Sequence, residues 1–106
     1  MSKVGLNKAP IAKRLRYVRS QQGISQKSLG ILAGIDEFSA SARINQYEKG
    51  KHVPDYSTAK RLADSLNVPV TYLYADDDEL AEIILLFAES TKRQRIKIKN
   101  FLVSGE

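Results

Sequence analysis

Polar side chains dominate one face of the stretch from Ser41 to Lys49, and only the basic members of that face carry charge. Its outward positions are Ser41, Arg43, Asn45, Gln46 and Lys49. A helix that has only to be soluble usually mixes acidic with basic residues. In the major groove of DNA, Arg can donate two hydrogen bonds to guanine, and Asn or Gln can pair with adenine in the same bidentate way. These residue types therefore indicate recognition of base edges.

Two short helices joined by a turn would hold this face in place. The first is predicted over about 26–33, with the Ser25 hydroxyl as its N-cap. The second is predicted from residue 39 or 40 to residue 49. Gly34 suits the turn because it lacks a Cβ and tolerates a positive φ, and Gly50 ends the second helix. Apolar residues three apart face inward in each helix: Leu29 with Leu32, and Ile44 with Tyr47.

Apolar spacing predicts three more helices around this pair. They cover about 10–22, 55–66 with Asp55 as its N-cap, and a short segment from Pro69 that contains Tyr72 and Leu73. The first has a buried stripe made of Ile11, Leu15 and Val18. The five helices together suffice for a compact all-α bundle with its own core.

A two-helix tail is predicted after this bundle, which divides the chain into a unit over 1–75 and a tail over 76–106. Acidic residues 76–79 begin the first tail helix, and Ser90 or Thr91 caps the second. The tail carries more apolar residues than one docked helix needs, so it forms either a lid over its own core or a dimer interface. We favour a homodimer interface. Its expected members are Leu80, Ile83, Ile84, Phe87, Phe101 and Leu102.

The net charge of +5 is unevenly distributed along the 106 residues. The charge is +8 through residue 61, −7 over 62–89 and +4 from residue 90 onward. A basic amino-terminal half is typical of a protein that binds a polyanion. The acidic middle argues against a protein that simply coats nucleic acid. Solvated helix faces are the alternative explanation of the charge.

Several classes of function are disfavoured by composition. The chain has no cysteine, and its single histidine, His52, has no second histidine or nucleophile at helical spacing, so neither a metal site nor a catalytic triad is expected. We expect no enzyme activity and no cofactor. Residues 76–79 are better explained as charges that complement a helix dipole than as a cation site. No apolar run reaches membrane-spanning length, which favours a cytoplasmic protein without a membrane partner.

An ordered set of motifs resembles the Cro/C1-type, or XRE-like, helix-turn-helix family of phage repressors and small bacterial transcription regulators. The first motifs are Leu15-Arg16 with Arg19, Gly23-Ile24-Ser25-Gln26, the small residue Gly30 and the turn Gly34-Ile35. They are followed by the run Ile44-Asn45-Gln46-Tyr47-Glu48-Lys49-Gly50-Lys51, by Pro54, and by Leu62-Ala63 with Leu66-Asn67-Val68. The resemblance implies a five-helix, lambda-repressor-like DNA-binding bundle. A small residue at Gly30 would let two helix backbones approach closely.

The resemblance also implies roles for individual residues. Base contacts fall on Ser41, Ala42, Arg43, Asn45 and Gln46. Contacts to the DNA backbone fall on Gln26, Lys27, Ser39, Lys49, Lys51 and His52. Arg19 borders the buried stripe of the first helix and needs an acidic partner, for which Glu48 is the candidate. In relatives this pair is structural.

One departure from the family pattern lies before the recognition helix. Ile44 lies ten positions after Gly34, where the family pattern usually has six, so about four residues are inserted around 36–39. Either the turn is longer, or the recognition helix gains a turn at its front with Ser39 as its cap. Asp36 and Glu37 are expected to point away from DNA. We expect Phe38 to pack under the longer turn, the alternative being a wedge against a base step.

The sequence thus predicts a repressor-like regulator that binds a palindromic site in double-stranded DNA as a homodimer. An antitoxin-like or adaptor protein is the alternative, in which the tail binds a protein partner and the helix-turn-helix unit serves autoregulation or has lost DNA binding. The two hypotheses differ in whether Arg43 and Gln46 matter for duplex binding.

Overall fold

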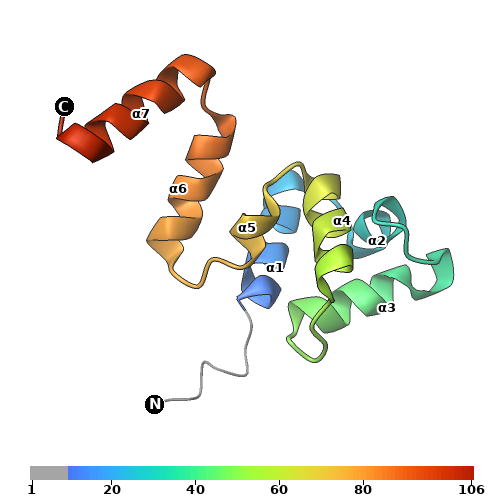
Figure 1. Cartoon of the computed structure of the whole chain (residues 1–106). Helices are drawn as coiled ribbons and strands as arrows, with labels where there is room; N and C mark the ends of the chain where they lie inside the picture. The colour runs from blue at the N-terminus through green and yellow to red at the C-terminus, as the bar shows by residue number, and fades with distance from the viewer. Residues whose placement is uncertain (1–9) are drawn as a thin grey trace, which may run out of the picture.

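The computed structural model describes residues 10–106, which form seven α-helices (Figure 1). They are α1 (Ile11–Gln22), α2 (Gln26–Leu32), α3 (Glu37–Glu48), α4 (Tyr56–Leu66), α5 (Val70–Leu73), α6 (Asp78–Glu89) and α7 (Lys92–Ser104). No strand occurs within the described range. The all-helical fold predicted from the sequence is therefore confirmed.

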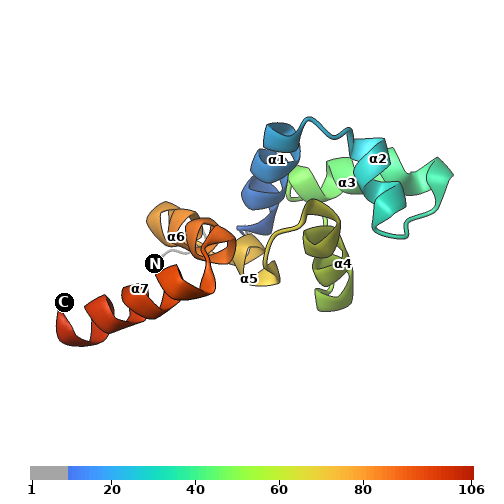
Figure 2. The same cartoon turned by 90° about the horizontal axis from the view of Figure 1, so that it is seen from above.

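The core lies among α1 to α5. Its largest fully buried side chains are Ile11, Leu15, Leu29, Ile44, Leu62, Leu66, Tyr72 and Leu73. The stripe predicted for the first helix is part of this cluster, with Val18 at its edge. In two perpendicular views, α6 and α7 extend away from the bundle, with α3 and α7 at opposite ends of the molecule (Figures 1 and 2).

Side-chain caps set the starts of several helices. The Ser25 hydroxyl accepts from the Ser28 amide at 3.0 Å, as predicted for the start of α2. Asp55 caps α4 in the same way through the Thr58 amide. Thr91 begins α7 and forms a reciprocal capping box with Gln94. These caps satisfy amides that a helix leaves unpaired at its first turn.

Gly30 allows α2 and α3 to approach closely, as the sequence predicts. A Cβ built on Gly30 would lie 2.6 Å from the Ala40 Cβ and 3.0 Å from its Cα. Gly34 has a φ of +89°, the left-handed region that favours glycine. The two glycines therefore fix the spacing and the turn of the α2–α3 pair.

The predicted inward position of Leu32 is wrong. Its side chain is 63% exposed, whereas Ala33 and Ile35 are buried. The reason is that α2 is short and ends at Leu32, after which the Ile35 amide donates back to the Gly30 carbonyl at 2.8 Å. The turn itself thus supplies the apolar contacts that a longer helix would have made.

The start of α3, the helix predicted to read DNA, also differs from the prediction. Of the two predicted effects of the insertion, the extended helix is the one observed, but α3 begins at Glu37 and its cap is Asp36 rather than Ser39. The Asp36 carboxylate accepts from the Phe38 amide at 3.0 Å. Phe38 does not pack under the turn, because its side chain is 92% exposed.

Candidate nucleic-acid interface

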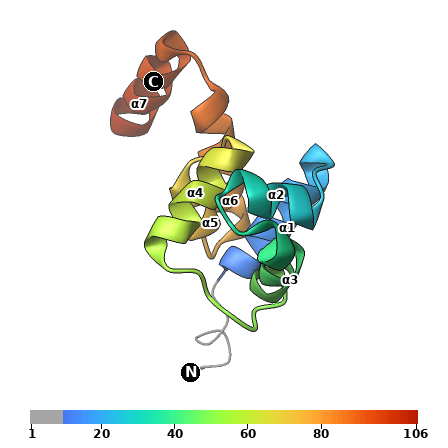
Figure 3. The ribbon, with the colours of Figure 1, turned by 90° about the vertical axis from the view of Figure 1, so that its right-hand side faces the viewer.

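The α2–α3 pair forms the surface on which the sequence places most of its polar recognition residues. The two helices lie side by side, with α4 next to them (Figure 3). The inward face of α3 is buried through Ala40, Ile44, Tyr47 and Glu48. Its outward face is therefore fixed in orientation by the core.

This outward face contains the predicted base contacts. Ser41, Ala42 and Arg43 are exposed, and Asn45 and Gln46 are half-buried. No acidic residue occurs in α3 between Glu37 and Glu48, and the latter side chain points into the protein. The face can therefore present hydrogen-bond donors and acceptors together with positive charge.

Arg19 and Glu48 form a bidentate ion pair between α1 and α3, the contact that the sequence predicts. Arg19 donates from Nε and from Nη2, the second bond measuring 3.0 Å to Glu48 Oε1. The remaining Nη1 donates to the Ile24 carbonyl at 2.9 Å. The bond to Glu48 raises the pKa of Arg19 above its ordinary value, although burial opposes this shift. The pair ties the end of α3 to the bundle.

Gln26 connects this ion pair to the outward face of α3. Its Nε2 donates to the side-chain oxygen of Asn45 at 3.2 Å and to Glu48 Oε1 at 3.1 Å. A side-chain amide has two protons, so both donors of Gln26 are used within the protein. The sequence predicts a phosphate contact for Gln26, whereas its side chain here restrains Asn45.

The other predicted backbone contacts surround α3. Lys27 lies 4.0 Å from a Glu37 carboxylate oxygen, and the Ser39 hydroxyl lies 3.5 Å from Asp36. Lys49, Lys51 and His52 are exposed where α3 ends. The amides of Lys51 and His52 donate to the Gln46 carbonyl, which folds this basic loop back against the helix.

Arg61 supports the α2–α3 pair, a role that no motif in the sequence indicates. Its Nε donates to the Ala33 carbonyl at 2.9 Å, and its other nitrogens reach the hydroxyls of Ser57 and Thr58. It therefore fastens α4 to the turn before α3. Because Ala33 is 28 residues away, no local pattern could reveal this contact.

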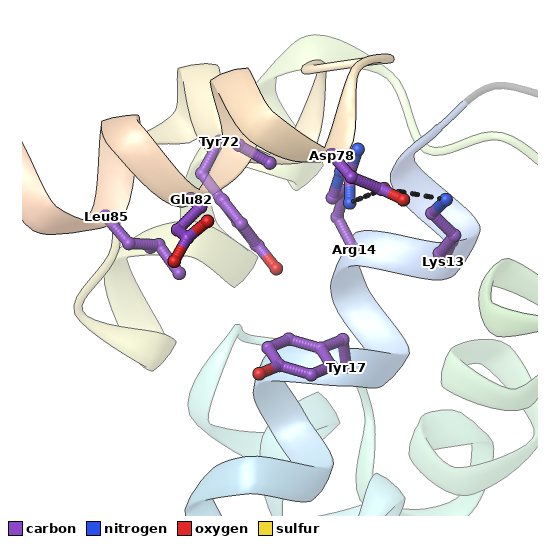
Figure 4. Close-up of a pocket in the computed structure, with 8 residues that line it drawn as sticks. Lys13, Arg14, Tyr17, Tyr72, Asp78, Glu82 and Leu85 are labelled. Atoms are coloured by element: carbon purple, nitrogen blue, oxygen red, sulfur yellow. Dashed lines mark hydrogen bonds and ion pairs between the residues drawn. The ribbon is translucent and has the colours of Figure 1, made fainter.

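Arg14 anchors the first tail helix in a corresponding way. Its Nε donates to the Ala75 carbonyl and its Nη1 to Asp78, each at 2.8 Å, and Lys13 also pairs with Asp78 (Figure 4). The bonds from Lys13 and then Arg14 lower the pKa of Asp78. The Asp78 carboxylate therefore joins α6 to α1, in addition to complementing the helix dipole.

These residues border a cavity of about 470 Å³ between α1, α5 and α6 (Figure 4). Tyr17, Tyr72, Glu82 and Leu85 line its other sides. Burial is the main cause that raises the pKa of Tyr72. Lysine, arginine, aspartate and glutamate all lie around it, so the cavity has no single charge character.

Across residues 10–106, no group of three or more histidine, aspartate or glutamate side chains is arranged to hold a metal ion. In the same range every helix is too short or too polar to cross a membrane.

Comparisons with known proteins identify similar chains. A family model described as a helix-turn-helix domain matches residues 12–79. The crystal structure of transcriptional regulator BswR is similar, with a TM-score of 0.82, 47% sequence identity and coverage of 86% of this chain and 90% of that chain. Two curated proteins, both named uncharacterized HTH-type transcriptional regulators, come from Sinorhizobium medicae and Rhizobium meliloti. Each is 33% identical over 66 residues, which is 62% of this chain and 45% of the relative.

The chain therefore spans slightly less than half the length of these two curated relatives. The matched family and the three named proteins are described by helix-turn-helix or transcriptional regulation, and none of them is described as an enzyme.

Proposed function

Because the chain belongs to the helix-turn-helix family of DNA-binding transcriptional regulators, we propose that it binds a palindromic operator in double-stranded DNA as a homodimer and acts in a repressor-like manner. In this proposal α3 lies in the major groove. A groove-reading helix presents its exposed side chains to base edges while its opposite face remains in the protein core.

The outward face of α3 is the observation that supports this proposal best. It is exposed or half-buried, lacks acidic side chains and is restrained by the Arg19–Glu48 pair and Gln26. Ser41, Ala42, Arg43, Asn45 and Gln46 are assigned to base contacts. Lys27, Ser39, Lys49, Lys51 and His52 are assigned to the DNA backbone, where contacts position the protein without reading sequence.

The exposed apolar surface of α6 and α7 supports the homodimer. Five of the six residues predicted for the interface are more than one-third exposed, and the sixth, Ile84, packs partly against the core. Ala81 is the only buried residue of α6, and α7 has none. A second copy of the tail would cover these side chains. The exposed members are Leu80, Ile83, Phe87, Phe101 and Leu102.

The same apolar surface is also consistent with the antitoxin-like or adaptor alternative, because a different protein could cover it. Duplex binding and the oligomeric state of the chain together separate the two hypotheses. Under the adaptor hypothesis, changes on the outward face of α3 leave the tail and its partner unaffected.

Selection of bound duplexes from a random pool is the decisive experiment. We expect a palindrome whose half-sites are separated by about one helical turn, roughly 34–36 Å. Arg43→Ala and Gln46→Ala should each weaken binding by about 1–3 kcal/mol and relax the base preference, whereas Lys51→Ala should weaken all duplexes alike. The regulator proposal fails if no duplex is enriched, or if none of these variants alters binding.

A further inference from the structure

Phe38 is the most exposed large apolar side chain among residues 10–106, at 92%. A single exposed apolar residue on a surface is common, so its exposure alone indicates nothing. What distinguishes Phe38 is its place on the first turn of α3, in the segment that the insertion adds to the recognition helix.

The register of α3 places Phe38 in line with base-reading residues. Phe38, Ala42, Asn45 and Lys49 follow one another at steps of four, three and four, which puts them on one stripe of a helix. Ala42 and Asn45 are proposed base contacts. From Phe38 to Asn45 the helix rises about 10.5 Å, the length of roughly three base pairs. Phe38 therefore extends the base-facing stripe by one turn.

The added turn is capped by hydrogen bonds, and its two acidic side chains, Asp36 and Glu37, have partners within the protein. Asp36 is bound to the Phe38 amide as the helix cap, and its carbonyl accepts from the Ser39 amide at 3.0 Å. The neighbouring Glu37 lies within 4.0 Å of Lys27 on α2. An aromatic ring on a capped turn has few rotatable bonds, so little conformational entropy is lost when it makes a contact.

We propose that Phe38 contacts the C5-methyl group of a thymine in each half-site and thereby selects an A·T pair there. This inference rests on the proposed function. The thymine methyl is the apolar group that DNA presents in the major groove, and phenylalanine is among the side chains that pack against it. The exposure of Phe38 in the unbound protein leaves its ring available for this contact.

The test uses deoxyuridine, which pairs like thymidine but lacks the methyl group. Each thymine of the selected palindrome is replaced in turn, symmetrically in both half-sites, and binding is measured by fluorescence anisotropy. For the wild-type protein we expect one position where the replacement weakens binding by about fourfold per half-site, or about fifteenfold in total, from the loss of one buried methyl contact. For Phe38→Ala, the thymine duplex should already bind at least that much more weakly, and uracil should cause no further loss.

Leu32→Ala is the matched control, because it removes another exposed apolar side chain of the α2–α3 pair. It should keep the full response to uracil. Circular dichroism of Phe38→Ala should match that of the wild type, since an exposed side chain adds little to the core. A wild-type protein indifferent to uracil at every position would overturn the inference, as would a Phe38→Ala variant that stays sensitive to it.

The outcomes separate this inference from the proposed function. If wild-type protein enriches a palindrome but Phe38→Ala weakens every duplex equally, Phe38 acts as a wedge or a backbone contact, and the methyl assignment is wrong while the regulator proposal stands. If no duplex is enriched at all, both proposals are overturned together.

Discussion

Four side chains from three helices form one hydrogen-bonded network behind the outward face of α3: Arg19, Gln26, Asn45 and Glu48. Arg19 and Glu48 belong to the frame of the bundle, whereas Asn45 faces outward. Gln26 joins the two parts. The network therefore lets a framework ion pair determine the orientation of a proposed base-reading amide.

Arg19→Ala should lower the stability of the fold. Glu48, whose side chain is 4% exposed, would keep only its bond from Gln26, and an unpaired buried carboxylate costs about 3 kcal/mol. For a domain of this size such a loss lowers the melting temperature by about 15 °C. Calorimetry or thermal circular dichroism measures it.

Lys60→Ala is the matched control for Arg19→Ala, because Lys60 pairs with Asp64 on the exposed side of α4. Exposed pairs of this kind add little to stability. If Arg19→Ala is no less stable than Lys60→Ala, the Arg19–Glu48 pair does not support the frame.

Gln26→Ala should alter sequence preference and not only affinity. Loss of the bond to Asn45 frees that side chain to turn, so discrimination at its base pair should weaken by about 1 kcal/mol, the value of one hydrogen bond. Binding to the selected duplex and to single-base variants of it measures this change. A loss equal for all duplexes would mean that Gln26 acts on phosphate, the role that the family resemblance implies.

The packing of α2 on α3 depends on the absence of a side chain at Gly30. Gly30→Ala would place a Cβ within 3.0 to 3.1 Å of the Ala40 Cα and carbonyl oxygen, which belong to the backbone and cannot turn aside. Overpacking costs about 1–3 kcal/mol and should exceed the roughly 1 kcal/mol that alanine gains over glycine inside a helix. Urea unfolding should therefore show a less stable variant.

Ser28→Ala tests the same helix at an exposed position, and we expect it to be neutral or slightly stabilising. A Gly30→Ala variant that is more stable than the wild type would show that α2 and α3 can separate without cost.

The helices and their caps could be predicted where a local signal was unambiguous. Ser25 and Asp55 each precede an apolar pattern, and each caps the helix that follows. Before α3, however, the sequence predicts Ser39 as the cap, and this prediction is wrong because Asp36, an equally suitable residue three positions earlier, caps the helix. Because Asp36 is the cap, α3 starts about one turn earlier than predicted, and Phe38 becomes a helical residue on its outward stripe.

Long-range contacts could not be predicted for a different reason. Arg14 and Asp78 are 64 residues apart, and Arg61 binds a backbone carbonyl on another helix. Such pairs depend on how the helices are arranged in space. By contrast, the Arg19–Glu48 pair was predictable, because both residues fall within motifs whose arrangement the family resemblance supplies.

The proposed division of the chain after residue 75 separates the bundle from the tail. Contacts at the start of α6, however, join that part of the tail to the bundle. Asp78 binds Arg14, and Ala81 belongs to the buried core. A truncation at residue 76 would remove both and leave Arg14 without its carboxylate. The start of α6 therefore belongs structurally to the bundle, and a truncated bundle should retain it.

The connection between α6 and α7 is also ordered by specific contacts. Arg95 donates to the carbonyls of Phe87 and Ala88, and its guanidinium lies 4.9 Å from the centre of the Phe87 ring. These contacts fix the bend between the two helices. The apolar side chains of the tail are therefore presented in a set arrangement, which favours one mode of pairing between copies.

Phe101→Glu should convert the proposed dimer to a monomer without unfolding the chain. Phe101 is 58% exposed and no residue of α7 is buried, so the isolated protein loses little, whereas a dimer interface would have to bury a charge. Sedimentation velocity should show the loss of the dimer. Affinity for a duplex with two half-sites should fall, while affinity for a single half-site should not change.

Asn100→Glu introduces the same charge on a neighbouring exposed position of α7, about half a helical turn away from the apolar side chains of Ile98 and Leu102. This control should remain dimeric, because its carboxylate stays in water. Wild-type protein that is monomeric at micromolar concentration would contradict the dimer and direct attention to a different protein as the tail's partner. A Phe101→Glu dimer of unchanged stability would place the interface elsewhere than on this face of α7.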